Sequence, residues 1–471
     1  MGRGCSRDGN VGPLGVCIMR RATLFRTTIT SAFLLLVFLV LGNSQTAQAQ
    51  TPLPACQQEL GLDLVFPSPQ YNEDDTIFWI NQSENSLWRS QDNGETWLQV
   101  FKFTSSPLYP AKIEQFQMTP HSADRGLTLY LGVNDIFHRQ YHLYRSEQTG
   151  DGWEERVASC SSFDDDCISY SLRAAGQTPI LFQPRWWMYG WSPLPFGVAR
   201  SDDGGMTWQM VWEETHVWKV AVSPDYDNDQ TLWATLMSNS PTLGTAFILS
   251  RDGGATWQAA GQGMCDDMFL YSDFVVSPGY TRNGALLMGL YQNSLFQSKD
   301  GGLTWQAIFP RGTTAVCDSS LTELGRYYPR FAPGYPDDPT IYVAATRAGL
   351  YASYDDGQSW RRLTVSGTVF SLEVAAQAEA STIEVAGASE PVSDAMAAVN
   401  SSTLLHQVFL PRVGAPGSPT PVRPYSLFMR AYVAGTIDAY MYRSDDGGAT
   451  WQCMEKPQVR RRTYLPLLTK E

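Results

Sequence analysis

Lysine and long apolar runs are scarce in this chain of 471 residues. Six Lys stand among 34 basic residues, and charged residues make up 17% of the sequence, against 39 Gly and 28 Pro. This composition is typical of a turn-rich fold and disfavours a long helical bundle. The formal charge of -13 would repel a phosphate backbone, which excludes nucleic acid as a partner. Rings are abundant instead, with 15 Trp and 22 Tyr.

The first 49 residues are predicted to be a secretory signal rather than part of the fold. Met19, an alternative start, is followed by Arg20-Arg21, an apolar run from Ala32 to Leu41, and the small-residue pattern that ends at Ala49. About ten apolar residues are too few to cross a bilayer core, which requires roughly 20, so no membrane span is expected. We expect cleavage near Ala49 and export to the cell surface or medium, with general and twin-arginine export both open. Without these residues the charge is -17.

A short motif, Ser-x-Asp-x-Gly-x-Thr-Trp, recurs along the rest of the chain. Five copies are intact, a sixth replaces Thr with Ser, and a seventh keeps Ser146, Gly150 and Trp153 but has Gln148 in place of Asp. Successive serines are 56, 55, 49, 48, 55 and 91 residues apart, a period typical of repeat architectures. The motif aspartates are Asp92, Asp203, Asp252, Asp300, Asp355 and Asp446, and the tryptophans are Trp97, Trp153, Trp208, Trp257, Trp305, Trp360 and Trp451.

Each copy lies between two short apolar runs and is therefore predicted to be the turn of a β-hairpin. Asp can accept backbone N–H bonds within such a turn, and Gly supplies a positive φ. A looser pattern precedes most copies, as in Pro69-x-Tyr71-x-x-Asp74-x-Thr76. Each unit of about 50 residues then contains four short strands, which predicts an all-β, seven-bladed propeller of four-stranded antiparallel blades.

These repeats resemble the Asp-box, or bacterial neuraminidase repeat, superfamily of sialidase-like β-propellers. That superfamily includes sialidases, xyloglucanases, sortilin-type receptors and photosystem assembly factors. The resemblance implies that the motif lies on the hairpin between the third and fourth strands of a blade, away from the axis where ligands bind. It therefore implies a structural role for the motif aspartates, and a ligand face at the opposite end of the blades.

The predicted propeller spans residues 50–457, followed by a tail over residues 458–471. The longest interval between motifs contains an Ala-, Ser- and Pro-rich segment, residues 375–425, predicted to be a flexible insertion between the first and second strands of blade seven. The roles of the insertion and of the tail are open at this point.

Six cysteines follow the signal, an even number that favours disulfides in an exported chain. We expect Cys56 to pair with Cys453 across the ends of the ring, Cys160 with Cys167, and Cys265 with Cys317. Six cysteines allow 15 arrangements, so this connectivity is a hypothesis.

Ligand-binding candidates gather in the connections assigned to the ligand face. Four rings and an arginine stand close together in blade three: Arg185, Trp186, Trp187, Tyr189 and Trp191. They would form either a sugar-stacking platform or a self-packed loop. Acidic candidates are Asp266, Asp267 and Asp318, with Asp164, Asp165 and Asp166 as weak calcium candidates for which solvated charge is the favoured explanation. No cofactor is expected, and His138 and His142 are predicted to be loop and strand residues rather than zinc ligands.

The sequence favours an exported, non-catalytic propeller, expected to be a monomer, that binds a glycan or a protein at the cell exterior. The alternative is a glycoside hydrolase, sialidase-like or xyloglucanase-like, that uses two carboxylates of the ligand face. No arginine signature typical of sialidases is visible, and no pair of carboxylates is singled out, so the catalytic residues and the ligand stay unassigned.

Overall fold

The computed structural model describes the residues of the unit Thr51–Glu471 over many separate ranges. The described ranges are 53–54, 56, 63–104, 111–120, 126–135, 138, 140–156, 173–175, 180–185, 196–264, 273–289, 294–309, 326–346, 349–363, 368–377, 425–432 and 439–457. The predicted signal, the tail and most of the predicted insertion lie outside them. Within these ranges no helix is both long and apolar enough to cross a membrane.

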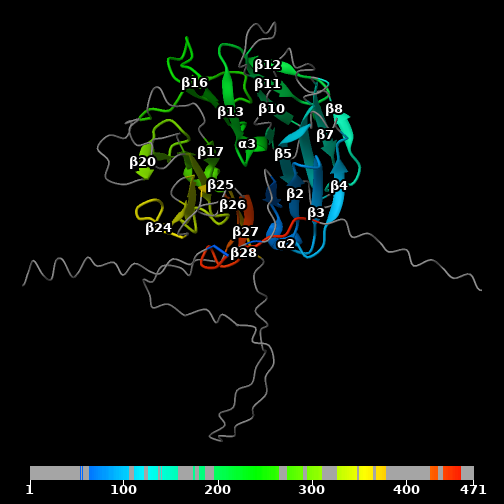
Figure 1. Ribbon diagram of the computed structural model, residues 1–471. Coiled ribbons are helices and arrows are strands. Elements are labelled where there is room, and N and C mark those ends of the chain that lie inside the picture. Colours follow the sequence, from blue (N-terminus) through cyan, green and yellow to red (C-terminus); the bar gives the residue numbers. More distant parts are fainter. Residues whose placement is uncertain are drawn as a thin grey trace, which may run out of the picture. The chain divides into compact units, whose positions relative to one another are not determined.

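Seven four-stranded antiparallel sheets are formed by the described residues, and they follow one another around a ring (Figure 1). Blade one contains β1 (Leu64–Pro67), β2 (Ile77–Asn81), β3 (Ser86–Ser90) and β4 (Leu98–Lys102), and blade two contains β5 (Lys112–Pro120), β6 (Leu127–Asp135), β7 (Gln140–Ser146) and β8 (Glu154–Arg156). Blade three contains β9 (Arg173–Ala175), β10 (Ile180–Arg185), β11 (Gly197–Ser201) and β12 (Gln209–Trp212), and blade four contains β13 (Val217–Val222), β14 (Leu232–Leu236), β15 (Phe247–Ser250) and β16 (Gln258–Ala259). Blade five contains β17 (Asp273–Val276), β18 (Leu286–Gly289), β19 (Leu295–Ser298) and β20 (Gln306–Phe309). Blade six contains β21 (Tyr327–Phe331), β22 (Ile341–Ala345), β23 (Gly349–Ser353) and β24 (Arg361–Arg362), and blade seven contains β25 (Thr368–Ala376), β26 (Tyr425–Tyr432), β27 (Ala439–Ser444) and β28 (Gln452–Cys453).

The predicted seven-bladed propeller is therefore confirmed. Second strands such as β2, β14 and β22 are buried at every residue, because neighbouring blades cover both faces of each sheet. Outer strands such as β4 are partly exposed. The predicted insertion, residues 375–425, overlaps the strands of blade seven at both ends. β25 extends to Ala376, with Ala375 buried in the core, and β26 begins at Tyr425.

The recurring motif forms the turn between the third and fourth strands, as predicted. In blade three the Ser201 hydroxyl donates to Asp203 Oδ1 over 2.8 Å and accepts from the Gly205 N–H over 2.8 Å. Asp203 also accepts from the Thr207 N–H over 2.9 Å and from the Thr207 hydroxyl over 2.6 Å. The same bonds recur in the other intact copies, and the motif glycines have φ of 81° to 98°. The copy without Asp keeps the serine half, since the Gly150 N–H donates to Ser146 Oγ over 3.1 Å.

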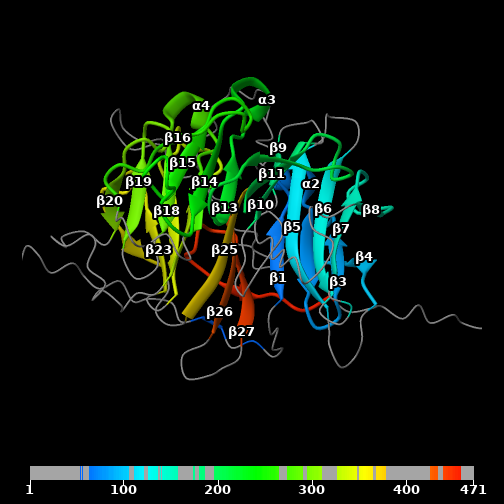
Figure 2. The same ribbon diagram turned by 90° about the horizontal axis from the view of Figure 1, so that it is seen from above.

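The connection between the first and second strands bonds to this turn. In blades one, four and five it contains one turn of helix, named α2 (Tyr71–Asp74), α3 (Tyr226–Asp229) and α4 (Tyr280–Asn283). Within each of these blades a backbone N–H of the motif donates to the residue that ends the helix, as from Gly253 to the Gln230 carbonyl over 3.0 Å. Figure 2 shows α3 and α4 at the same end of their sheets. This end is called the motif face below, and the opposite end, where first strands begin, is the ligand face.

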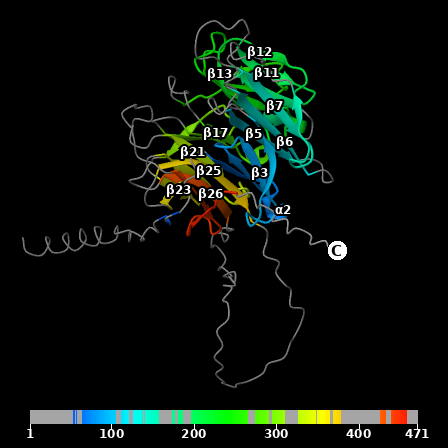
Figure 3. The same cartoon turned by 45° about the vertical axis from the view of Figure 1, so that its right-hand side comes forward.

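The first and last blades meet where the ring closes. β1 contacts β25 and β26, and the blue first blade lies beside the orange last blade in Figure 3. The segment at Leu53 and Pro54 packs on blade seven, and the Tyr442 hydroxyl donates to the Pro54 carbonyl over 3.4 Å. Cys56 forms a disulfide with Cys453 of β28, with Cα atoms 5.6 Å apart. This pairing confirms the predicted link, whereas the other four cysteines lie outside the described residues.

Loss of this disulfide should loosen the closure. Replacing Cys56 and Cys453 together with Ser should lower the free energy of unfolding by about 4 kcal/mol, because the bond constrains a very long segment of the unfolded chain. Urea unfolding without reductant measures the difference from the parent. A double variant as stable as the parent would contradict a role in closure, and Cys160→Ser with Cys167→Ser serves as the control.

Acid should weaken the motif turns in a narrow pH window. Hydrogen bonds from the Thr207 hydroxyl and N–H lower the pKa of Asp203 to about 2, from the usual 3.8. At the other five motif aspartates burial opposes ionisation, but the same kinds of hydrogen bond outweigh it and the pKa is again lowered. A lowered pKa stabilises the fold above about pH 4, and this stabilisation is lost as pH falls through the folded-state value. We expect the melting temperature to fall between about pH 4 and pH 2, and to fall less steeply in Asp203→Asn. An equal dependence of melting temperature on pH in both proteins would show that ionisation of Asp203 does not stabilise the fold.

Candidate functional site

Most sequence-predicted site residues fall outside the described part of the chain. These residues are Trp186, Trp187, Tyr189, Trp191, Asp164, Asp165, Asp166, Asp266, Asp267, Asp318, Cys160, Cys167, Cys265 and Cys317. Arg185 is the last residue of β10, opposite Gly197 of β11, so the tryptophan-rich segment joins the second and third strands of blade three as expected. Its guanidinium Nη1 lies 3.6 Å from the Met210 sulfur.

An aromatic pair stands beside the ends of this segment on the ligand face. Phe196 lies directly before β11, and His216 lies directly before β13 of the next blade. Their ring centroids are 4.0 Å apart and the planes differ by 19°, a stacked arrangement. Both rings are half-buried. Sequence inspection missed this pair because its two rings come from different blades.

A carboxylic acid with a raised pKa lies near the start of the innermost strand of blade two. Glu114 of β5 is half-buried, and its Oε1 accepts from the Asn134 amide over 3.2 Å. Its Oε2 is buried and forms no hydrogen bond within the described residues. Burial raises the pKa of Glu114, although the Asn134 hydrogen bond and the charge of Lys112 oppose the shift. Burial without a hydrogen bond to this oxygen disfavours the charged form of the carboxyl group.

A second carboxyl group, Asp63, lies directly before β1 on the same face. It is 1% exposed and accepts from the Trp79 indole over 3.0 Å and from the Gln82 N–H over 2.9 Å. Burial raises its pKa, which the Trp79 hydrogen bond and the charge of Lys456 partly offset. The Gln82 amide in turn donates to the Ile113 carbonyl, the residue before Glu114, over 2.6 Å. The two carboxyl groups are therefore linked through Gln82, but Asp63 is closed off by its partners.

A chain of four alternating charges joins the innermost strands of four successive blades. Lys219 of β13 pairs with Asp273 of β17, which lies 3.2 Å from Arg330 of β21. Arg330 in turn lies 2.8 Å from Glu373 of β25. Burial opposes the charge on Asp273, but Lys219 and Arg330 hold its pKa below the usual range. The pKa of Arg330 is raised, since Glu373 and Asp273 outweigh the opposing effect of burial.

Breaking this chain at Arg330 should be costly. Arg330→Met would leave two carboxylates next to each other in a largely desolvated setting, and we expect a loss of about 3 kcal/mol in the free energy of unfolding. Urea unfolding at pH 7 measures this loss of free energy. The control is Arg361→Met, which replaces an exposed arginine of the same blade. Equal stability of the two variants would show that the charges contribute little.

The two histidines of blade two are not brought together as metal ligands. His138 Nδ1 lies 2.7 Å from Asp135, whereas His142 Nδ1 on β7 lies 2.7 Å from Glu155. Each imidazole thus has a different carboxylate partner. Among the described residues, no group of three or more His, Cys, Asp and Glu side chains is placed to hold a metal ion. The calcium candidates Asp164 to Asp166 are not among those residues.

Comparison with known proteins gives one curated relative over most of the chain. The sequence is 24% identical over 444 residues to the xyloglucanase of Hypocrea jecorina, a match that covers 85% of this chain and 47% of that enzyme. The chain thus spans about half the length of the relative. No protein-family profile matches the sequence.

Solved structures similar to this chain are also propellers of low sequence identity. The GH74 xyloglucanase of Xanthomonas campestris is 14% identical, with 81% of this chain and 60% of that chain covered and a TM-score of 0.36. YCF48 from Cyanidioschyzon merolae is 14% identical, with 69% and 92% covered and a TM-score of 0.42. At these scores the likenesses carry no argument about function.

The curated match corrects one expectation from the sequence. A non-catalytic binding scaffold was favoured because no carboxylate pair stood out, yet the relative that matches over most of this chain is an enzyme named for hydrolysing a polysaccharide. The expectation failed for a physical reason: carboxyl groups such as Glu114 acquire their chemistry from burial, which no local motif records.

Proposed function

We propose that this chain is a glycoside hydrolase, or the half of one that forms a single propeller, and that it acts on a xyloglucan-like polysaccharide. The observation that carries the proposal is the match to a xyloglucanase over 85% of the chain. The mature protein's excess of acidic residues also suits an uncharged polysaccharide better than an anionic one.

Hydrolysis of a glycosidic bond requires a proton donor for the leaving oxygen and a second carboxylate that activates water or attacks the sugar. Glu114 has two properties of the donor, since burial raises its pKa and the residue is half-buried rather than enclosed. We assign it that role. Asp63 is too enclosed to reach a polymer, and Asp273 and Glu373 are held by Arg330.

The second carboxylate is therefore sought among Asp266, Asp267 and Asp318, which the sequence assigns to connections of the same face. The stacked rings of Phe196 and His216 offer a flat apolar surface of the kind that suits the C–H side of a pyranose. Catalysis would then place sugar units across the ligand face between blades two and four.

The test compares reducing-sugar release from soluble xyloglucan by the parent and by Glu114→Gln. The glutamine keeps an oxygen for the Asn134 amide but has no proton to donate, so we expect a loss of at least about 100-fold in kcat with the melting temperature preserved. Because the acid must be protonated, parent activity should fall as pH rises through the raised pKa of Glu114, above the usual 4.5.

The matched control is Glu84→Gln, which changes an exposed carboxylate between β2 and β3 on the same face and should leave the rate unchanged. Full activity in Glu114→Gln would remove this residue from the mechanism while leaving the hydrolase proposal intact. No sugar release by the parent from xyloglucan or from other plant polysaccharides would refute the function itself.

A further inference from the structure

A side chain of the third strand commonly crosses to the motif turn of the next blade. Arg89 donates to the Thr149 carbonyl over 2.7 Å, Arg200 to the Gly253 carbonyl over 2.8 Å, and Arg443 to the Asn93 carbonyl over 2.8 Å. Each arginine directly precedes the motif serine, and each acceptor is the fourth residue of the next motif. The guanidinium group therefore fills the space between two turns on the motif face.

The junction between blades four and five departs from this pattern. Leu249 stands where blades one, two, three and seven have arginine and blade five has Gln297, and it is buried in the core; blade six has Ala352 at this position. The carbonyl at the equivalent position, Gly301, accepts instead from the Trp233 indole over 2.8 Å. No guanidinium group from the third-strand position occupies the space above this turn.

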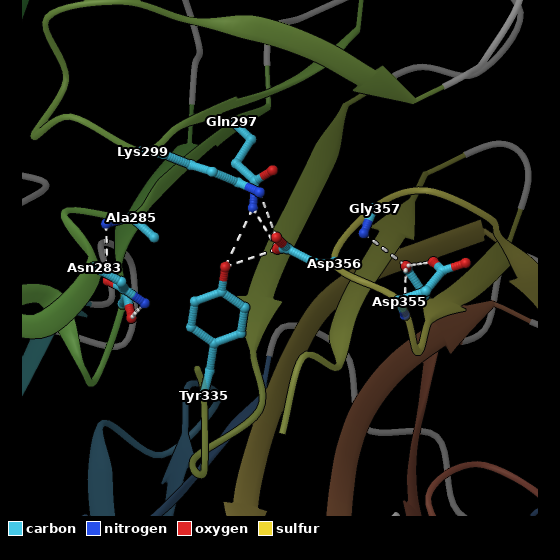
Figure 4. A network of polar contacts seen from close by, with 10 residues as sticks. Asn283, Ala285, Gln297, Lys299, Tyr335, Asp355, Asp356 and Gly357 are labelled. Carbon is cyan, nitrogen blue, oxygen red and sulfur yellow. Dashed lines mark hydrogen bonds and ion pairs between the residues drawn. The ribbon is translucent and has the colours of Figure 1, made fainter. Parts of the chain in front are cut away.

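Gly301 enlarges the same space, because it lacks a side chain where blades one, two and six have one. In blade one the Tyr71 hydroxyl donates to Asn93, and in blade six the Tyr335 hydroxyl donates to Asp356 over 2.7 Å. Figure 4 shows the filled arrangement of blade six, where Gln297 of the preceding blade also donates to Asp356, over 2.7 Å. A Cβ atom added to Gly301 would lie 2.9 Å from the Tyr280 hydroxyl and 3.6 Å from Arg251 Nη2.

The space forms a wide-open hollow of about 460 Å³ between the two blades. It is lined by Asp229, Thr231, Arg251, Tyr280, Thr281, Arg282, Asn283, Gly284, Asp300 and Gly301. Arg251 is exposed and forms no hydrogen bond or ion pair within the described residues. Tyr280 packs its ring edge-on against Trp233, with centroids 4.9 Å apart.

The charges in the hollow select the class of ligand. Asp229 and Asp300 already accept hydrogen bonds from Ser223, Thr231, Ser298 and Thr304, and Arg282 is paired with Asp337 over 2.9 Å. Hydrogen-bond donors of Arg251 and Arg282 are left over, but the two aspartates and Asp337 balance the positive charge. An anion would meet no net attraction, whereas the hydroxyl oxygens of a neutral sugar can accept from these guanidinium groups.

We propose that this hollow binds a neutral sugar unit, as a second saccharide site on the motif face, at the opposite end of the blades from the ligand face. The inference does not rest on the proposed hydrolysis. Such a site would hold the protein on a polysaccharide without taking part in chemistry.

A substitution that fills part of the hollow is Gly301→Asn, which requires the end of the Tyr280 side chain to shift because the new Cβ would lie 2.9 Å from its hydroxyl. The φ of 76° at Gly301 is close to the 60° of Asn93 and the 58° of Asp356, so the chain already accommodates a side chain at this motif position. The new amide would bond to Tyr280, as Asn93 does to Tyr71. Arg251→Met removes the free donors and keeps the length of the side chain.

Affinity electrophoresis in gels that contain xyloglucan, mixed-linkage glucan, galactomannan or polygalacturonate measures retention. We expect at least one neutral polysaccharide to retard the parent. For that polysaccharide, the apparent Kd of each variant should be about fivefold or more above that of the parent. The rate of hydrolysis of short soluble oligosaccharides should not change, which separates this site from the ligand face.

The matched control is Gly447→Asn, the same change at the equivalent position of blade seven, where φ is 68°. It should leave retention within twofold of the parent. The proposal is overturned if Gly301→Asn and the parent are retained equally, if no neutral polysaccharide retards the parent, or if the loss is confined to polygalacturonate.

Discussion

A four-stranded sheet with two apolar faces has to be covered on both sides, and in this protein each cover is the next copy of the same sheet. Strands such as β2, β14 and β22 are buried at every position for that reason. Every blade, including the first and the last, therefore needs a neighbouring blade on each face, so the ring has to close. The β1–β25 contact and the Cys56–Cys453 disulfide satisfy this condition, and the two cysteines are 397 residues apart.

The two ends of the blades have different physical tasks. On the motif face, backbone carbonyls of the turns are bonded by side chains of the preceding blade, as Arg89, Arg200 and Arg443 show. These contacts hold the blades in register. The ligand face carries groups whose chemistry comes from burial, namely Glu114, Asp63 and the alternating charges from Lys219 to Glu373.

Repetition also makes departures from the repeat informative. Gln148 in place of a motif Asp leaves the serine half of the turn intact, so the departure costs little structure. Gly301 lines a hollow at the junction where Leu249 stands in the position that is occupied at four other junctions by Arg89, Arg200, Arg443 and Gln297.

The sequence by itself determined the blade count and the place of each motif turn between third and fourth strands, because both follow from local patterns repeated at a regular period. The Cys56–Cys453 link was a hypothesis among 15 arrangements, and the structure decided it. The sequence also placed the Arg185 segment between the second and third strands of blade three. It did not single out Glu114, the stacking of Phe196 on His216, or the charge chain through Arg330. Those depend on which side chains the ring brings together from different blades and on how deeply it buries them. Burial and proximity across blades are properties of the closed ring, so only the tertiary structure decided them.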